Sequence, residues 1–421
     1  MAKIVTQRRQ IFVYADWVDL GKTILMGILQ TEPLRGKEVF SFSYNKEWME
    51  KGPALVLDPE LGLYSGPQYS REDKPNFGLF TDSSPDRWGR LLMDRREALI
   101  ARQEKRKPRH LMESDYLLGV FDLHRMGGLR FKLDPEGPFL NADHELSAPP
   151  FTTIRTLEEA SLHLEDADAI SDPNYVKWLK LLISPGSSLG GARPKASVAD
   201  PKGNLWIAKF PSRNDDRDIG AWESVVNELA VRSGVKVAEG QARRFTQHYH
   251  TFLTKRFDRE RSNRIHFASA MTLLGQKDGA DSAVGISYLH LAEFIMRYGA
   301  SPEIDLQELW RRIVFNICVS NSDDHLRNHG FLLTPKGWIL SPAFDINPIP
   351  NSTGLNLNIS EHSNALDLEL ARQVAEKFRV NEMDREVIIK KVTKAVGHWQ
   401  EIATKAGISR SEIQRLENTF I

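Results

Sequence analysis

Three polar side chains in the stretch from residue 320 to residue 345 have the types and spacing needed for phosphoryl transfer. Asp323 and Asn328 stand five residues apart in "NSDDHLRN", and Asp345 follows seventeen residues after Asn328 in "SPAFDIN". Amide and carboxylate oxygens suit Mg²⁺ when phosphate and water complete its shell. The pattern therefore predicts Asn328 and Asp345 as metal ligands and leaves Asp323 to orient an attacking hydroxyl. A helix-terminal loop with Asx turns would explain the same residues.

Phosphoryl transfer also needs groups that hold phosphates, and upstream segments offer them. The loop "SPGSSLGGARPK" contains Gly190 and Gly191, which let backbone amides approach a phosphate closely. It lacks the ending of a P-loop, so this loop alone favours a plain glycine turn. Lys209 lies in the apolar stretch "LWIAKF", where its ammonium either meets an anion or extends to water. Glu228 on the following helix is a candidate partner of Lys209 or an ordinary surface glutamate.

The elements that must position these residues change character along the chain. Residues 1 to about 60 alternate apolar and polar positions, which predicts a β-rich unit, whereas the pattern from about residue 285 is helical. Between them, "DIGAWESVVNELAVRSGV" predicts a helix whose apolar positions include Val225, Val226 and Leu229. Polar clusters at the junction of the two halves indicate two lobes around a cleft.

Composition excludes several classes of protein. The 421 residues suffice for two or three domains, and 56 basic residues balance 56 acidic ones, so the chain has no overall field that attracts nucleic acid or an anionic membrane. The basic run "RQEKRKPRH" is either a local nucleic-acid patch or a solvated helix end. The single cysteine, Cys318, excludes an intramolecular disulfide and favours a reducing cytoplasmic setting. No stretch approaches the roughly 20 apolar residues that span a bilayer, so no membrane contact is expected.

The tail "IATKAGISRSEIQRLENTF" has the apolar spacing of a helix-turn-helix, and Ser409 with Glu412 forms a capping box. A complete DNA-binding domain needs further supporting helices. We therefore expect an ordinary terminal helix pair packed on the helical lobe.

Taken in order, these motifs resemble those of the HipA family of serine/threonine kinases, the toxin halves of bacterial toxin–antitoxin pairs. The resemblance covers most of the chain. It rests on "SSPDRWGRLLM" in the N-terminal subdomain, "SLGGARPKASV" as the glycine loop, "IAKF" as the ATP lysine strand, "VNELA" as the helix glutamate, "TKRFDR" as the hinge, "NSDDHLRNHGF" as the catalytic loop and "LSPAFDINP" as the metal segment. The last two motifs together are highly specific.

The resemblance implies a role for each matching position. Asp323 would be the catalytic base, and Asn328 and Asp345 would bind Mg²⁺. The remaining implied ATP-site residues are Ser188, Gly190, Gly191, Lys209, Glu228, His325 and the hinge residues Lys255 and Phe257. Several relatives carry an acidic residue in place of Lys255, so only backbone contacts to adenine are expected there. Autophosphorylation of the glycine loop silences the kinase in this family; Ser188 aligns with the modified serine and Ser187 is adjacent.

The implied fold is α+β and two-lobed, like protein kinases, with a β-rich N-terminal part and an all-α C-terminal lobe. Its expected domains are residues 1–130, 150–260 and 261–421. The implied protein is an ATP- and Mg²⁺-dependent toxin kinase that phosphorylates a translation component such as an aminoacyl-tRNA synthetase. Its implied partner is a HipB-like helix-turn-helix antitoxin, with DNA contacted only through that complex.

Two alternatives from other classes remain open. A small-molecule or lipid kinase would share the catalytic loop, although "SSPDRWGR" favours HipA. A catalytically silent co-repressor that acts with its antitoxin would be expected to have lost at least one of Lys209, Asp323, Asn328 and Asp345, and all four are present.

Overall fold

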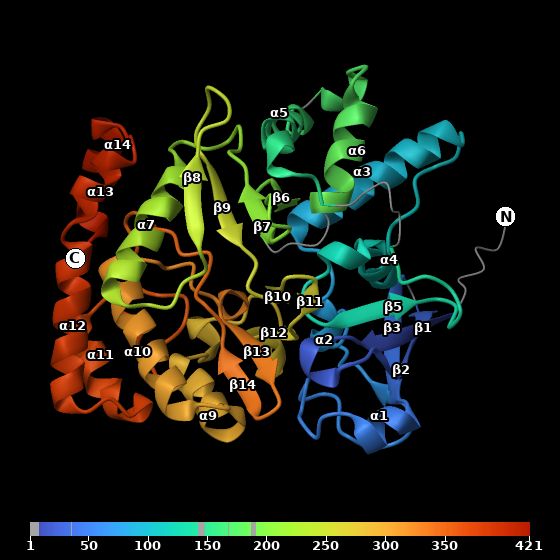
Figure 1. Cartoon of the computed structure of the whole chain (residues 1–421), viewed down its shortest axis with the longest axis horizontal. Helices are drawn as coiled ribbons and strands as arrows, with labels where there is room; N and C mark the ends of the chain where they lie inside the picture. The colour runs from blue at the N-terminus through green and yellow to red at the C-terminus, as the bar shows by residue number, and fades with distance from the viewer. Residues whose placement is uncertain (1–7, 35, 142–147, 167, 187–190) are drawn as a thin grey trace. The chain divides into compact units, whose positions relative to one another are not determined.

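The computed structural model describes residues 8–34, 36–141, 148–166, 168–186 and 191–421 (Figure 1). For residues 184–186 only the backbone is described. These residues form two compact units. The first unit is Met1–Ala208 with Asp258–Ala268, and the second unit is Lys209–Phe257 with Ser269–Ile421. The three-domain division with limits at 130, 150 and 260 stays a prediction.

The first unit is built on an antiparallel sheet in the order β4-β3-β2-β1-β5. Its strands are β1 (Arg9–Ala15), β2 (Ile24–Leu34), β3 (Lys37–Tyr44), β4 (Gln68–Tyr69) and β5 (Leu129–Lys132). Alternate residues of β1, from Ile11 to Ala15, are fully buried, so one face of the sheet forms a core. The β-rich unit expected near the N-terminus is thus observed.

Helices complete the first unit. They are α1 (Lys46–Lys51), α2 (Gly78–Thr81), α3 (Arg87–Gln103), α4 (Glu113–Gly119), α5 (Ile154–Leu164) and α6 (Tyr175–Gly186), with the short 3-10 helices η1 (Val18–Leu20), η2 (Asp122–His124), η4 (Phe151–Thr153) and η5 (Ala169–Ser171). The helix predicted after Pro85 is α3, and Asp86 caps it by accepting a hydrogen bond from the Arg87 amide at 2.7 Å. Helix α6 packs against both α3 and α5. Strands β6 (Lys195–Ala199) and β7 (Leu205–Lys209) follow, and the division between the units falls before the last residue of β7.

A short hairpin far along the sequence belongs to the first unit. It consists of β10 (Arg259–Glu260) and β11 (Asn263–Arg264). The carboxylate of Asp258 accepts a hydrogen bond from the Gly127 amide at 2.9 Å, and Arg264 donates to the carbonyl of Asp122 at 2.6 Å. Because these groups are buried, the bonds attach residues 258–268 firmly to the segment that precedes β5.

The second unit is mainly helical, as the sequence predicts. Its helices are α7 (Ile219–Ser233), α8 (Ala270–Leu273), α9 (Tyr288–Tyr298), α10 (Pro302–Cys318), α11 (Leu368–Val374), α12 (Glu382–Val396), α13 (Trp399–Lys405) and α14 (Arg410–Arg415), with η6 (Ser282–Val284), η7 (Leu326–Asn328), η8 (Ala375–Phe378) and η9 (Glu417–Thr419). Helix α10 is buried on most of its surface and contacts α9, α11 and α12. Helices α7, α12 and α13 lie side by side (Figure 1).

Strands also occur in the second unit. Strands β8 (Gly240–Arg243) and β9 (Thr251–Lys255) form an antiparallel pair, as do β13 (Gly330–Thr334) and β14 (Gly337–Leu340). The β13–β14 hairpin adds strands to a lobe that the resemblance describes as all-α. It forms because two apolar runs flank Gly337, whose φ of +130° allows the turn. Strand β12 (Phe267–Ser269) crosses the division between the units.

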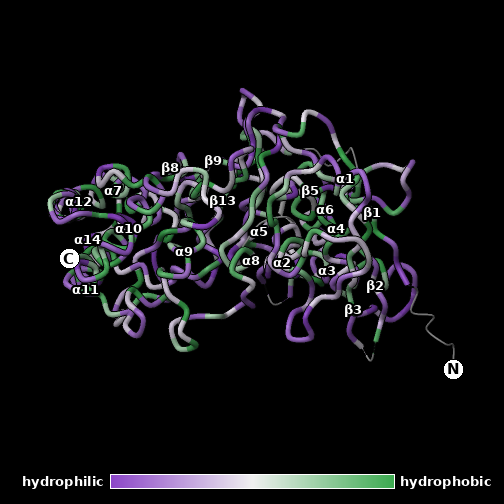
Figure 2. Tube along the Cα trace, turned by 90° about the horizontal axis from the view of Figure 1, so that it is seen from below, coloured by the Kyte–Doolittle hydropathy of each residue, from purple (hydrophilic) through white to green (hydrophobic). Residues whose placement is uncertain are grey.

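The apolar residues are distributed along many elements. Figure 2 shows that apolar and polar stretches alternate along the trace. Among the described residues, no helix is long and apolar enough to cross a membrane.

Candidate functional site

Lys209 forms ion pairs with two carboxylates of the second unit. Its Nζ donates hydrogen bonds to Glu223 Oε1 at 2.5 Å and to Asp345 Oδ1 at 2.7 Å. Burial alone would lower the pKa of Lys209, but the two carboxylates outweigh burial and raise it. The lysine is therefore held charged beside Asp345, so the apolar strand does place its ammonium against anions rather than in water.

The predicted partner of Lys209 was wrong. Glu228 is exposed and pairs with Arg232 one turn further along α7, whereas the buried Glu223 reaches Lys209. Five residues correspond to about 500° of helix rotation, which turns Glu228 well away from the face of Glu223. The signal was present in the sequence, because Glu223 lies in phase with the buried Val226 and Ala230.

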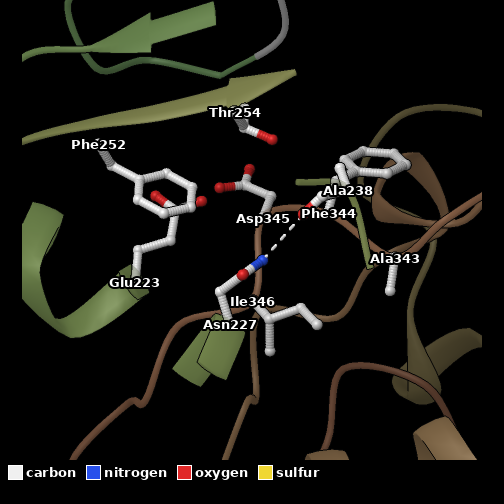
Figure 3. Close-up of a pocket in the computed structure, with 9 residues that line it drawn as sticks. All are labelled: Glu223, Asn227, Ala238, Phe252, Thr254, Ala343, Phe344, Asp345 and Ile346. Carbon is white, nitrogen blue, oxygen red and sulfur yellow. Dashed lines mark hydrogen bonds between the residues drawn. The ribbon is translucent and has the colours of Figure 1, made fainter. Parts of the chain in front are cut away.

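A small pocket surrounds the carboxylate of Asp345 (Figure 3). It is lined by Glu223, Asn227, Ala238, Phe252, Thr254, Ala343, Phe344, Asp345 and Ile346. Figure 3 shows Glu223, Phe252 and Asp345 among the side chains that line the pocket, and Asn227 Nδ2 donates to the Ala238 carbonyl at 3.1 Å. The pocket thus combines two acids with apolar walls.

Backbone pairing fixes the position of Asp345. Ala343 pairs with residues 236–238 through two hydrogen bonds, Ala343 N to Lys236 O at 2.7 Å and Ala238 N to Ala343 O at 3.1 Å. The buried Arg312 guanidinium donates to the Ser341 carbonyl at 2.7 Å. The chain then turns at Asp345, whose φ is +58°, a conformation that Asp tolerates better than most residues.

The predicted catalytic loop follows α10 and leads into η7. The Asp323 carbonyl accepts hydrogen bonds from the His325 amide and from Asn328 Nδ2, both at 2.9 Å. Although residue Asp323 is open to solvent, partial desolvation of its carboxyl and the nearby charges of Asp345 and Asp324 raise its pKa, against the opposing effect of His325. Nδ1 of His325 is buried without a hydrogen-bond partner among the described residues.

The donor set fits a hard divalent cation. Because Asn328 uses Nδ2 for the bond to Asp323, its Oδ1 is the atom it can offer to a metal. Asp345 presents a carboxylate that is about one third exposed and bound to Lys209 through Oδ1. One carboxylate and one carboxamide match the preference of Mg²⁺ for a few protein oxygens, with phosphate and water as the other ligands.

Of the predicted hinge residues, Lys255 is the last residue of β9 and Phe257 follows the strand, both in the second unit. The Lys255 amide donates to the Glu239 carbonyl at 2.8 Å, and the Lys255 ammonium lies 3.7 Å from the Glu239 carboxylate. The ring of Phe257 contacts that of Phe344, the neighbour of Asp345, with centroids 5.4 Å apart. The structure therefore brings Phe257 close to the pocket and keeps the Lys255 side chain half-exposed with an acidic partner.

A buried carboxylate behind the loop was missed by the sequence reasoning. Asp324 accepts hydrogen bonds from the Tyr288 hydroxyl and from Asn316 Nδ2, and its Oδ1 lies 3.0 Å from His329 Nε2. Burial would raise the pKa of Asp324, but His329 and the hydrogen bonds lower it overall. Asp324 thus fixes the loop to α9, α10 and the start of β13, whereas its neighbour Asp323 faces solvent.

Replacing Asp324 with Ala should destabilise the protein by about 3 to 5 kcal/mol, because it leaves several buried polar groups without their charged partner. Chemical denaturation followed by circular dichroism measures this change. Asp323→Asn is the matched control, and its cost should be no more than about 0.5 kcal/mol because that side chain is exposed. Equal free energies of unfolding for the two variants would contradict the assigned difference between the carboxylates.

The C-terminal tail forms hydrogen bonds both to the start of α7 and to the segment that precedes the catalytic loop. Oε2 of Glu412 accepts hydrogen bonds from the Asp218 amide at 3.1 Å and from Trp222 Nε1 at 3.2 Å, at the start of α7. The Thr419 carbonyl accepts from the Ser320 hydroxyl at 2.7 Å, just before the catalytic loop. The tail packs as a terminal helix pair on the helical unit, as expected.

The glycine loop is only partly described. Ser187, Ser188 and Gly190 lie outside the described residues, so nothing is said of their placement. Gly191 is described, with φ +89°, and belongs to the first unit. The structure therefore brings together Lys209, Asp323, His325, Asn328 and Asp345 within the second unit and leaves the roles of the loop residues as predictions.

Comparison with known proteins identifies relatives of this chain. A family model described as the HipA-like C-terminal domain matches residues 187–413, which is more than half of the chain. Y4mE of Sinorhizobium fredii, which is named a putative kinase, is 24% identical over 404 residues. The match covers 89% of this chain and 82% of Y4mE. A Haemophilus influenzae protein named in the same way is 33% identical over 122 residues, covering 25% of this chain and 35% of its own.

A solved structure shows the same fold. It is the complex of HipA from Shewanella oneidensis MR-1 with HipB and its operator DNA, and the similarity has a TM-score of 0.64 at 18% sequence identity. The alignment covers 97% of this chain and 94% of that one. The expected mixed α/β, kinase-like fold is confirmed.

Proposed function

The chain belongs to the HipA family of kinases, and on that premise we propose that it is an ATP- and Mg²⁺-dependent serine/threonine protein kinase that acts as a toxin. The observation that carries the proposal is Lys209, whose side chain is only 13% exposed and is bonded to Glu223 and Asp345 at 2.5 and 2.7 Å. A kinase needs such a lysine fixed by a helix glutamate beside a metal-binding aspartate.

The proposed reaction assigns one task to each residue. Asp323 orients a protein serine or threonine hydroxyl and takes its proton as the oxygen attacks the γ-phosphorus in line. The bond from that phosphorus to the bridging oxygen breaks, and ADP leaves. Lys209 neutralises phosphate charge, and the backbone near Lys255 and Phe257 holds the adenine. Mg²⁺ held by Asn328 and Asp345 would neutralise the phosphates further. Catalysis then comes chiefly from positioning and charge stabilisation.

The proposed substrate and partner follow from the family. The substrate is a translation component such as an aminoacyl-tRNA synthetase, and the antitoxin is a HipB-like protein that contacts DNA. Support for the partner comes from the Shewanella structure, whose HipA was solved with HipB and operator DNA. Nothing in the described residues of this chain selects one synthetase over another.

Calorimetry with ATP tests the nucleotide site. We expect binding that needs Mg²⁺ and that is lost with EDTA, because Asn328 and Asp345 contribute only two ligands and phosphate completes the shell. Binding of ATP with turnover of a sugar or lipid instead of protein would favour the small-molecule kinase. Absence of ATP binding by the intact protein would favour the silent co-repressor.

Phosphorylation of Ser188 should weaken ATP binding. The modification adds about −1.5 to −2 charges to a loop proposed to hold phosphates, so repulsion opposes the nucleotide. Titration of ATP into phosphorylated and unphosphorylated protein measures the effect, with Ser188→Ala as the sample that cannot be modified there. Equal affinity of the two forms would contradict silencing through this loop.

A further inference from the structure

The segment "SSPDRWGR" at residues 83–90 has no task in the proposed reaction, yet it holds the end of the glycine loop. Both partners belong to the first unit. Asp86 Oδ2 accepts a hydrogen bond from the Gly191 amide, while Oδ1 of the same carboxylate caps α3. The amide of Trp88 donates to the Gly191 carbonyl at 3.4 Å, and its indole Nε1 donates to the Lys195 carbonyl at 3.0 Å.

The segment at residues 83–90 that makes these bonds is itself fixed by packing and by further hydrogen bonds. Trp88 is 2% exposed, so its indole is fixed by packing. Arg90 of the same helix forms a bidentate pair with Glu113 at 2.7 Å for each bond, and the fully buried Arg125 donates to the Ser83 carbonyl at 2.7 Å. Bidentate arginine pairs impose direction as well as energy. The start of α3 is therefore fixed by the pairing of its residue Arg90 with Glu113 and by the Arg125 bond to Ser83 before it. This fixed helix start can hold Gly191 in one position.

The loop end that it holds is itself constrained. Gly191 has φ +89°, which favours glycine, and a Cβ built there would lie 2.6 Å from the Lys195 ammonium. Lys195 is 4% exposed, so a positive charge is packed against the peptide that Asp86 binds. A carboxylate, a glycine amide and a buried ammonium thus meet at the C-terminal end of the loop.

We infer that Asp86 and Trp88 are positioning residues that hold the Gly191–Lys195 segment in the geometry in which the glycine loop receives the phosphates of ATP. The inference rests on the proposed function. Backbone amides bind phosphate well only when their directions are fixed beforehand. Loss of the hydrogen bonds from Asp86 and Trp88 to this segment should therefore raise the KM for ATP more than it lowers kcat.

Asp86→Ser provides the sharpest variant, because serine still caps α3 but is too short to reach Gly191 as well. We expect the KM for ATP to rise about tenfold, as for loss of one hydrogen bond to a charged group, with kcat nearly unchanged. Asp86→Asn has one oxygen acceptor in place of two, because its Nδ2 can only donate, so it should cap α3 but lose the bond from the Gly191 amide and behave like Asp86→Ser. Asp94→Asn is the matched control on α3, since Asp94 accepts a hydrogen bond from the Tyr116 hydroxyl and has none with the described loop residues 191–195.

Hydrogen exchange of the Gly191 to Lys195 amides in the protein without nucleotide gives a second readout. Exchange should accelerate in Asp86→Ser and in Trp88→Phe, which loses the indole donor together with part of the buried ring, and should be unchanged in Asp94→Asn. Unchanged exchange and unchanged KM in Asp86→Ser would overturn the inference. Failure of the wild-type protein to bind ATP would instead overturn the proposed function.

Discussion

Replacing Asp323 with Asn should lower the rate of phosphate transfer by a factor on the order of 10² to 10⁴, the usual contribution of a positioned general base. The variant keeps the side-chain volume but cannot take the proton of the attacking hydroxyl. ATP binding should change little, because the backbone carbonyl of Asp323, not its carboxylate, makes the bond to Asn328. Single-turnover kinetics with labelled ATP measures the transfer step, and calorimetry measures binding.

Because Asp323 is exposed, its replacement should change activity without changing the stability of the protein. Since only its neighbour Asp324 is buried in a bonded network, Asp323→Asn should unfold at nearly the wild-type denaturant concentration. A variant with near-wild-type turnover would reject Asp323 as the base. A variant that loses ATP binding and activity together would assign it a binding role instead.

Replacing Lys209 with Met should lower turnover by a factor on the order of 10² to 10³, as expected for removal of one preorganised charge from a phosphoryl-transfer site. Methionine retains the apolar stem but leaves Glu223 and Asp345 without the cation between them. Steady-state kinetics over a range of ATP concentrations separates the effect on kcat from that on KM. Unchanged kinetics would contradict the role of Lys209 at the phosphates.

Two glutamates on α7 provide the control for that prediction. Glu223→Gln should impair turnover, because it removes a carboxylate that holds the Lys209 ammonium. Glu228→Gln should behave as wild type, because Glu228 is exposed and contacts Arg232. The opposite ranking would contradict the geometry and would favour the pairing first expected from the sequence.

Much of the candidate site could be predicted from short-range patterns. Asp323, Asn328 and Asp345 stand in two compact motifs, so their order and residue types are enough to indicate a metal site and a base. Lys209 was a candidate because a lysine inside an apolar strand either meets an anion or extends to water, and its bonds to Glu223 and Asp345 decide for the anions. The helix α7 was also predictable from its apolar period, and its buried Val225, Val226 and Leu229 are those expected.

Other features depend on three-dimensional neighbours that the sequence does not display. Choosing between Glu223 and Glu228 required the phase of α7 relative to Lys209, which a motif alone does not fix. From the sequence, Asp324 looks like an ordinary loop residue. Its buried role depends on Tyr288 and His329, which lie 36 and 5 residues away in the sequence and contact it in the fold. The bond between Asp86 and Gly191 joins segments 105 residues apart, and no local pattern predicts such a contact.

Phosphopeptide mass spectrometry of the purified protein after incubation with Mg²⁺ and labelled ATP, beside an Asp323→Gln sample, is the decisive test of protein kinase activity in this chain. We expect the wild-type protein to transfer phosphate to serine in the peptide containing residues 184–188, and the variant to transfer none. No incorporation into a wild-type sample that starts unphosphorylated and binds ATP would contradict a protein kinase with a self-modifying glycine loop.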